Sequence, residues 1–353
     1  MASDNDAKKA KLESHLLYAE IKTVEMHTGG EPLRIITSGF PDVEGSTVLA
    51  KRRYCREKLD HLRKMLIFEP RGHYNMYGAI LVEADIKEAD FGVIFIHNEG
   101  YSTMCGHAII ALGRYALDYG IVKGVAPETQ VNIQCPCGLV RAFVQYDENT
   151  KQSGRVRFES VPAFAFSTQL EIETEKYGNV IVDIGYGGAF YAVAHASQFG
   201  LNVRESRTRD LVDAASHVTE CAKRQVQLSH PVDDDLAFLY GTIVTDGKDE
   251  FDAKEPTANI CVFADDEVDR SPTGSGVTAR IAIQHRRGLI QLNQLRHFES
   301  IVNSRFTGKA IRTTRCGDFP AVVVEVSGRA YYTGTATFTA ETDDERAEGF
   351  LLH

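Results

Sequence analysis

The chain has 353 residues, of which 43% are hydrophobic and 25% charged, and its formal net charge is −10. A chain of this length is long for one hydrophobic core and predicts two domains. The acidic balance disfavours nucleic acid and anionic membranes as partners. The sequence contains no run of about 20 apolar residues that would predict a membrane span.

The N-terminal segment, residues 1–13, is polar and lacks the apolar stretch of a secretory signal. We expect residues 1–18 to form a mobile tail. Seven cysteines without such a signal indicate reduced thiols in the cytoplasm rather than a disulfide framework. No second pair of ligands follows Cys135-Pro136-Cys137, so no metal site is expected. Structural roles are predicted for every cysteine except Cys105, namely Cys55, Cys135, Cys137, Cys221, Cys261 and Cys316.

Alternating apolar runs punctuated by glycine and proline predict a chain rich in strands. Residues 23–36 read as a strand, a glycine turn and a second strand. The turn residues His27, Thr28 and Glu31 either line a pocket or belong to a plain hairpin. Helices are predicted over residues 54–68 and 207–228. Further strands are predicted over residues 76–82, 91–96, 131–133, 139–146, 155–159, 180–184, 190–194, 236–245, 259–264, 298–302, 310–314, 321–326 and 329–340. The segment 161–166 is expected to cross between the domains.

The most informative stretch is Met104-Cys105-Gly106-His107, which lies between the strand 91–96 and an apolar helix that ends at Gly120. The first amides of a helix lack internal partners and favour a negative charge, as does the helix dipole. A thiol at this position can have its pKa lowered below the free value of about 8.5. The stretch therefore predicts a thiolate beside an anion-binding helix start. The alternative is a cysteine that packs as a small hydrophobic residue.

A second helix start has the same form. Thr273-Gly274-Ser275 follows a strand and a polar loop, and it precedes an apolar helix over residues 277–287. If the two halves of the chain pack face to face, both helix starts converge on one buried pocket suited to a carboxylate. Cys105 and Thr273 would then face opposite sides of a ligand carbon.

These motifs resemble those of the proline racemase family. The resemblance rests on the Cys105 stretch, on Asp269-Arg270-Ser271-Pro272-Thr273-Gly274-Ser275-Gly276, and on residues 27–32. It implies an α/β (α+β) fold of diaminopimelate-epimerase type. Two similar domains each wrap a curved, mostly antiparallel sheet around a central helix, and the active site lies between them. The first domain would comprise residues 19–165 and about 335–353, and the second residues 166–334.

One position departs from the racemase pattern. The racemases carry a second cysteine where this chain has Thr273, and threonine marks the branch that dehydrates trans-3-hydroxy-L-proline. A threonine hydroxyl is too weak an acid to return a proton to the far face of the substrate. Elimination needs only one α-proton removed, and it yields an enamine that tautomerises to pyrroline-2-carboxylate. The resemblance thus implies a hydro-lyase. The alternatives are a proline or 4-hydroxyproline epimerase and a non-catalytic amino-acid-binding protein.

The resemblance also implies roles for individual residues. Cys105 is the general base, and Asp269 binds the ring nitrogen, with His107 as a second candidate for that contact. The role of Thr273 stays open between a hydrogen bond to the departing hydroxyl group and one to a water molecule. Carboxylate binding is assigned to Gly106, His107, Gly274 and Ser275. The family implies no metal, nucleotide or pyridoxal cofactor, and a homodimer is left open.

Overall fold

The structure is a computed structural model that describes residues 19–250 and 255–352. The predicted tail, residues 1–18, lies outside the described residues. Within the described ranges, no helix combines the length and the apolar character needed to cross a membrane.

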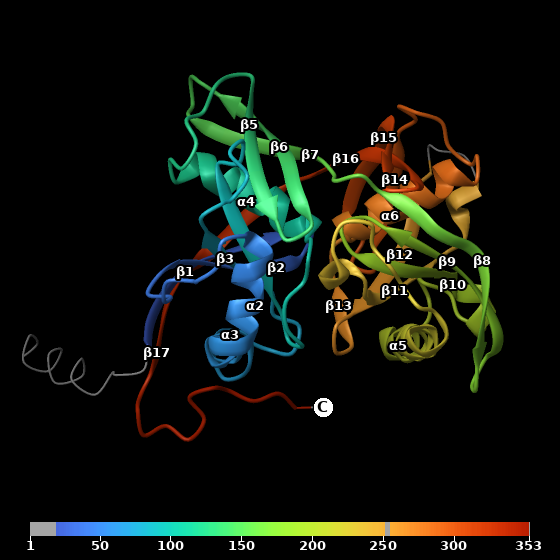
Figure 1. Cartoon of the computed structure of the whole chain (residues 1–353), viewed down its shortest axis with the longest axis horizontal. Helices are drawn as coiled ribbons and strands as arrows, with labels where there is room; N and C mark the ends of the chain where they lie inside the picture. The colour runs from blue at the N-terminus through green and yellow to red at the C-terminus, as the bar shows by residue number, and fades with distance from the viewer. Residues whose placement is uncertain (1–18, 251–254, 353) are drawn as a thin grey trace, which may run out of the picture.

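The described chain forms two lobes that lie side by side (Figure 1). Within the described ranges, seventeen strands form one continuous hydrogen-bonded sheet. Lobe 1 is built from the strands β1 (Ala19–Thr28), β2 (Glu31–Ser38), β3 (Gly78–Val82), β4 (Phe91–Ile96), β5 (Glu128–Cys135), β6 (Gly138–Asp147), β7 (Gln152–Glu159) and β17 (Ala330–Ala340). Lobe 2 is built from β8 (Phe164–Thr174), β9 (Gly178–Tyr186), β10 (Phe190–His195), β11 (Leu239–Thr245), β12 (Thr257–Phe263), β13 (Glu267–Asp269), β14 (Arg296–Ser300), β15 (Arg305–Cys316) and β16 (Phe319–Gly328).

Each lobe wraps its sheet around a central helix, α4 (Gly106–Asp118) in lobe 1 and α6 (Gly274–Arg286) in lobe 2. Helix α6 is enclosed although it carries buried polar residues such as Arg280 and Gln284. Helix α4 is apolar around most of its circumference, which is the pattern of a fully enclosed helix. Accordingly, the α4 residues Ala108, Ile109 and Leu112 are completely buried. The outer helices are α2 (Val48–Lys58) and α3 (Asp60–Ile67) on lobe 1 and α5 (Thr208–Gln225) on lobe 2.

The two lobes repeat one topology. The strand order β17-β1-β2-β3-β4-β5-β6-β7 of lobe 1 corresponds to β8-β9-β10-β11-β12-β14-β15-β16 of lobe 2. In each lobe the third and fourth strands of this order pair in parallel, as do the fifth and sixth. All other neighbours within a lobe are antiparallel, and β7 pairs with β16 to join the lobes. The predicted arrangement of two similar, mostly antiparallel sheets around central helices is confirmed. The domain boundaries given above remain predictions.

One helix prediction was wrong, and strand β8 was missed. The predicted helix over residues 54–68 is two helices, because Leu59 leaves the helical conformation at φ −120° and separates α2 from α3. Helix α2 also begins earlier, where the Thr47 hydroxyl accepts a hydrogen bond from the Ala50 amide. Strand β8 was not predicted. Register shifts near Ser167 interrupt its pairing with β9, so its apolar residues do not alternate regularly.

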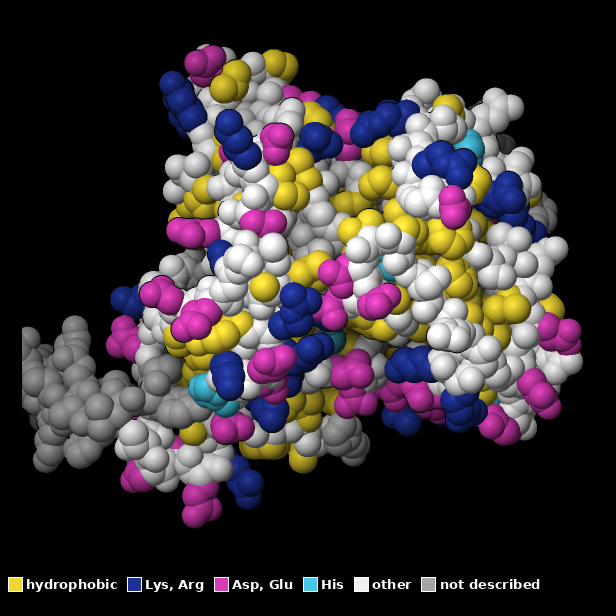
Figure 2. All heavy atoms as spheres, in the orientation of Figure 1, with side chains coloured by type: hydrophobic (Ala, Val, Ile, Leu, Met, Phe, Trp, Pro, Cys, Tyr) yellow, Lys and Arg dark blue, Asp and Glu magenta, His cyan; other side chains and the backbone are white. Residues whose placement is uncertain are grey.

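Charged side chains of both signs are interspersed over the face shown in Figure 2, without a large patch of one sign. Several ion pairs join the two lobes, among them the pair between the Arg53 guanidinium of α2 and the Asp235 carboxylate at 2.6 Å and the pair between Arg157 of β7 and Glu325 of β16 at 3.0 Å. This face therefore offers no continuous basic surface of the kind that binds nucleic acid.

Candidate active site

Cys105 caps the N-terminus of α4 at the boundary with lobe 2. Its side chain accepts a hydrogen bond from the Ala108 amide, with an N-to-Sγ distance of 3.4 Å. The residue is only 5% exposed. The sulfur therefore lies at the helix start, as the sequence predicts, and contacts one of the free helix amides directly.

The His107 ring also contacts the Cys105 thiol. Its Nδ1 lies 3.0 Å from the Cys105 sulfur, and its Nε2 lies 3.2 Å from the Pro32 carbonyl oxygen. Because a carbonyl only accepts, we assign the proton to Nε2, which leaves Nδ1 to accept from the thiol. Burial lowers the pKa of His107 to about 3, so the ring stays neutral.

The two central helices meet end to end at a pair of glycines. A Cβ atom on Gly106 would lie 2.5 Å from the Gly274 Cα, and one on Gly274 would lie 2.6 Å from the Gly106 Cα. Neither position tolerates a side chain without movement of the opposing backbone. The absence of a side chain at Gly106 admits the start of α6, and the two helix starts converge as expected.

Thr273 caps α6 in an unusual conformation. Its φ of 67° lies in the left-handed region, which is uncommon for a β-branched residue and marks a site of backbone strain. The hydroxyl oxygen is buried and makes no hydrogen bond of normal geometry with any described residue. It lies close enough to Asp269 and Cys261 to lower the pKa of each, although burial raises both overall.

A buried acidic cluster adjoins the two helix starts. The Asp269 carboxylate accepts a hydrogen bond from the Ser271 amide at 2.7 Å. Glu31 accepts from the Arg270 amide at 2.8 Å and pairs with its guanidinium at 3.1 Å. Burial raises the pKa of Asp269, Glu31 and Glu267. A cationic ring nitrogen of a ligand would stabilise the negatively charged form of these buried carboxyl groups.

The glycine hairpin of residues 28–31 contacts residues of the site. Besides the Glu31 contacts, the Thr28 hydroxyl donates a hydrogen bond to the His107 carbonyl oxygen at 2.8 Å. His27 instead stacks on the Tyr331 ring, with the ring centroids 5.4 Å apart. Thr28 and Glu31 therefore contact residues of the candidate site, and the interpretation that they line a pocket stays a prediction.

The expected direction of the Cys105 pKa shift was wrong. Burial raises the pKa of Cys105 well above its ordinary value, and the negative charge of Asp269 adds to this effect. The Ala108 amide lowers the pKa, as predicted from the helix start, but by less than burial raises it. The sequence identifies the helix start, whereas the depth of burial follows from the docking of the lobes.

Alkylation of Cys105 should therefore become faster throughout the alkaline range. Because the thiolate is the reactive form and its pKa is raised, the rate constant with iodoacetamide should increase about tenfold per pH unit from pH 7 to 9. The rate is measured by mass spectrometry of the Cys105 peptide, with the urea-unfolded chain as control. A plateau below about pH 8 in the folded protein would mean that the helix amides outweigh burial.

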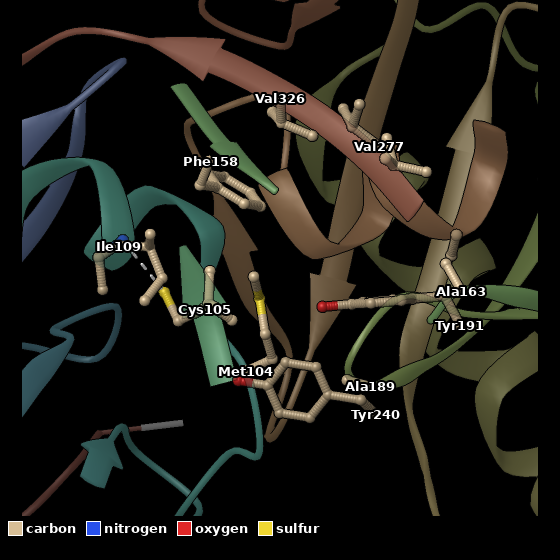
Figure 3. Packing of buried hydrophobic residues seen from close by; sticks show 14 of the residues in the cluster. Met104, Cys105, Ile109, Phe158, Ala163, Ala189, Tyr191, Tyr240, Val277 and Val326 are labelled. Carbon is tan, nitrogen blue, oxygen red and sulfur yellow. Dashed lines mark hydrogen bonds between the residues drawn. The ribbon is translucent and has the colours of Figure 1, made fainter. Parts of the chain in front are cut away.

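Three buried tyrosines that the sequence analysis missed surround the thiol. Tyr77 packs edge-on against the His107 ring at 4.9 Å, and its hydroxyl is hydrogen-bonded to Ser102. The Tyr191 hydroxyl is 2.7 Å from the Ser275 hydroxyl. Figure 3 shows Tyr191 and Tyr240 of lobe 2 directed toward the side on which Cys105 lies. Aromatic residues in strands are ordinary core residues, so no local sequence signal distinguished them.

A cleft of about 610 Å³ separates parts of the two lobes near this site. Arg52 and Tyr101 of lobe 1 face Lys223 and Phe238 of lobe 2 across it, whereas Cys105 and Thr273 are not among its lining residues. His97 and Tyr240 also line it and pack edge to face, with ring centroids 5.6 Å apart. The buried thiol thus lies behind an aromatic wall of the cleft.

One cluster elsewhere has the composition of a metal site. The side chains of Glu175, His217 and Cys221 place their ligand atoms within 4.8 Å of one another. The Arg224 guanidinium donates to Glu175 at 2.9 Å and contacts the Cys221 sulfur at 3.2 Å. The Arg224 guanidinium therefore already supplies a positive charge to this cluster. All seven cysteines are free thiols.

The geometry defines a class of protein in which two repeated lobes hold paired helix starts around a buried acid–base site. The chain matches the family model described as proline racemase over residues 23–351. It is 63% identical over 334 residues to a trans-L-3-hydroxyproline dehydratase of Xenopus tropicalis, covering 94% of this chain and 95% of the relative. It is 60% identical over 336 residues to a trans-3-hydroxy-L-proline dehydratase of Homo sapiens, covering 94% of each chain.

Among solved structures, it resembles a hydroxyproline epimerase from Agrobacterium vitis with bound trans-4-hydroxy-L-proline. The TM-score is 0.89 at 26% sequence identity, covering 96% of this chain and 97% of the other. The chain belongs to the proline racemase family.

Proposed function

We propose that this protein dehydrates trans-3-hydroxy-L-proline to pyrroline-2-carboxylate. The observation that carries the proposal is the pair of facing helix starts, one capped by Cys105 and the other by Thr273. Only one of the two positions can act as a thiolate base. The names of the dehydratases to which the chain is similar over nearly its full length support the same substrate and reaction.

The substrate carboxylate would bind between the two helix starts. The first amides of α4 and α6, those of Gly106, His107, Gly274 and Ser275, are donors that a helix leaves without internal partners. These donors also stabilise the negative charge that develops on the carboxylate when the α-proton leaves. The buried carboxylate of Asp269 would bind the cationic ring nitrogen.

Cys105 is then the general base. A cationic substrate nitrogen lowers the pKa of the thiol, because it offsets the nearby charge of Asp269. His107 stays neutral and accepts from the thiol in the resting state. Removal of the α-proton builds electron density at the α-carbon, and this density expels the 3-hydroxyl group. The enamine that remains tautomerises to the cyclic imine.

The experiment that tests this function is incubation with a panel of proline, 3-hydroxyproline and 4-hydroxyproline isomers. Mass spectrometry should find the loss of one water from trans-3-hydroxy-L-proline only. Inversion at the α-carbon without loss of water would instead support the epimerase, which the similarity to a hydroxyproline epimerase structure keeps as the second candidate. Binding without any turnover would indicate an amino-acid-binding protein.

Replacing Thr273 with cysteine should give the protein epimerase activity. The new thiol would cap α6 on the face of the substrate opposite Cys105, where helix amides can stabilise its thiolate. Cysteine also lacks the β-branch that makes φ 67° unfavourable for threonine. Optical rotation of L-proline and trans-4-hydroxy-L-proline, with α-deuterium uptake in D₂O, measures the gain.

The matched control is Thr273→Ser, which removes the same methyl group without adding a thiol. It should show no inversion. A folded Thr273→Cys protein that also shows none would mean that the residue at position 273 does not separate the two reactions.

We further propose a cytoplasmic location, since all seven cysteines are free thiols, as expected in a reducing compartment. A homodimer remains a prediction that sedimentation equilibrium can test.

A further inference from the structure

The stereochemistry of the substrate fixes the side from which its hydroxyl group leaves. This inference rests on the proposed function. In trans-3-hydroxy-L-proline the hydroxyl and the carboxylate lie on opposite faces of the ring, so the α-hydrogen and the hydroxyl share one face. A base that removes the α-hydrogen therefore approaches from the face that bears the leaving group. The departing oxygen faces Cys105 and points away from Thr273.

The acid that protonates the departing oxygen must then lie on the Cys105 side. His107 is a poor candidate, because burial lowers its pKa to about 3 and its Nε2 proton is engaged by Pro32. The Tyr191 hydroxyl is engaged by Ser275, and the Tyr77 hydroxyl by Ser102. The Tyr240 hydroxyl is buried and makes no hydrogen bond of normal geometry with any described residue. A buried hydroxyl that lacks a well-formed hydrogen bond costs stability, so the Tyr240 hydroxyl, which lies near the Tyr77 hydroxyl without normal hydrogen-bond geometry, is free to donate to a ligand.

Tyr240 and Tyr77 lie next to each other. The His97 ring packs against both, with ring centroids 5.8 Å from Tyr77 and 5.6 Å from Tyr240. The Phe263 ring does the same from lobe 2, at 6.1 Å and 5.1 Å. Burial raises the pKa of both tyrosines, so each hydroxyl keeps its proton at neutral pH. The Tyr77 hydroxyl lies close enough to Cys105 and to Tyr240 to lower the pKa of each.

We propose that Tyr240 is the acid that protonates the departing 3-hydroxyl group, and that Tyr77 returns the substrate proton from Cys105 to Tyr240. The Cα–H bond breaks and its proton passes to the Cys105 thiolate. Its electron pair forms the double bond between the α-carbon and C3, and the C3–O bond breaks. The oxygen takes the Tyr240 proton and leaves as water. The proton on Cys105 then moves through the Tyr77 hydroxyl to the Tyr240 phenolate, which restores both groups.

The position of Tyr240 at the cleft fits this role. Its ring forms part of the wall of the 610 Å³ cleft, while its hydroxyl oxygen is buried on the inner side. Tyr240 belongs to lobe 2, whereas Cys105 and Tyr77 belong to lobe 1. The acid and the base are therefore supplied by different lobes and meet only across their boundary.

The test compares two leaving groups in Tyr240→Phe. Fluoride leaves as an anion and needs little protonation, so trans-3-fluoro-L-proline, which has the same stereochemistry, should not require the acid. We expect dehydration of trans-3-hydroxy-L-proline to fall by about 10²-fold, and fluoride release from the fluoro analogue to stay within about threefold of wild type. Retained binding of pyrrole-2-carboxylate shows that the variant is folded.

The matched control is Tyr186→Phe. Tyr186 is also a buried tyrosine whose hydroxyl makes no hydrogen bond of normal geometry with any described residue, but it packs on His230 with ring centroids 4.5 Å apart. Both reactions should be unchanged in it. The acid role of Tyr240 would be overturned if Tyr240→Phe lost both reactions equally. It would also be overturned if the variant kept both reactions at the wild-type rate. If wild type does not dehydrate the hydroxy substrate at all, the proposed function itself fails, which is a distinct result.

Discussion

Replacing Cys105 with serine should lower the rate of dehydration by a factor on the order of 10² to 10⁴. Serine is nearly isosteric and can still accept the hydrogen bond from the Ala108 amide, so the cap of α4 is retained. Its hydroxyl, however, does not ionise in the range where a thiol does, so removal of the α-proton is slowed. The measurement is loss of water from trans-3-hydroxy-L-proline at saturating substrate, with pyrrole-2-carboxylate binding as the measure of folding.

The control for this variant is Cys316→Ser. Cys316 lies at the end of β15 and is 9% exposed, more than the other buried cysteines. Its replacement should leave activity unchanged. A Cys105→Ser protein that retains activity within about threefold of wild type would assign the base to another group.

Replacing Gly106 with alanine should have an effect of similar size through a different cause. The added Cβ would lie 2.5 Å from the Gly274 Cα and 2.8 Å from its carbonyl carbon, and neither backbone atom can rotate away. The helix starts must separate, which displaces the carboxylate-binding amides from the Cys105 sulfur. A displacement of about 1 Å can cost on the order of 10²-fold in rate, and overpacking costs about 1–3 kcal/mol in stability. Steady-state kinetics and thermal unfolding measure the two effects separately.

The comparison variant is Gly113→Ala in the same helix. There the new Cβ would lie 3.3 Å from methyl groups of Val144 and Val156, which can shift by a few tenths of an ångström. Alanine also stabilises a helix interior by up to about 1 kcal/mol relative to glycine. Activity should stay within a few-fold of wild type. Equal losses in the two variants would show that the contact between the helix starts has no special importance.

The parts of the site that sequence predicted are those encoded locally. Cys105 and Thr273 each follow a strand and begin an apolar helix, and this pattern alone places both at helix starts. The repeat of that pattern predicted their convergence on the condition that the two halves of the chain pack face to face. The same local encoding failed at Leu59, where one residue outside the helical region divides an otherwise regular helical stretch.

The parts that sequence did not predict depend on contacts between distant segments. Tyr77, Tyr191 and Tyr240 lie in or beside strands, where an aromatic residue usually packs in the core. The folding of lobe 1 brings the Tyr77 hydroxyl to the thiol, and the docking of lobe 2 brings those of Tyr191 and Tyr240. The raised pKa of Cys105 has the same origin, because burial between lobes opposes the helix amides that the sequence revealed.

The return of β17 to lobe 1 has a consequence for the order in which the protein folds during synthesis. β17 pairs with β1 over ten residues, and all strands of lobe 2 lie between β7 and β17 in the sequence. Lobe 2 is thus contiguous and can close its sheet while translation continues, whereas the β1 edge of lobe 1 stays unpaired until the last strand has left the ribosome. Domains made on the ribosome usually fold from the N-terminus onward. Here the lobe whose synthesis starts first is completed last, and an exposed strand edge of this kind invites pairing with other chains in the interval.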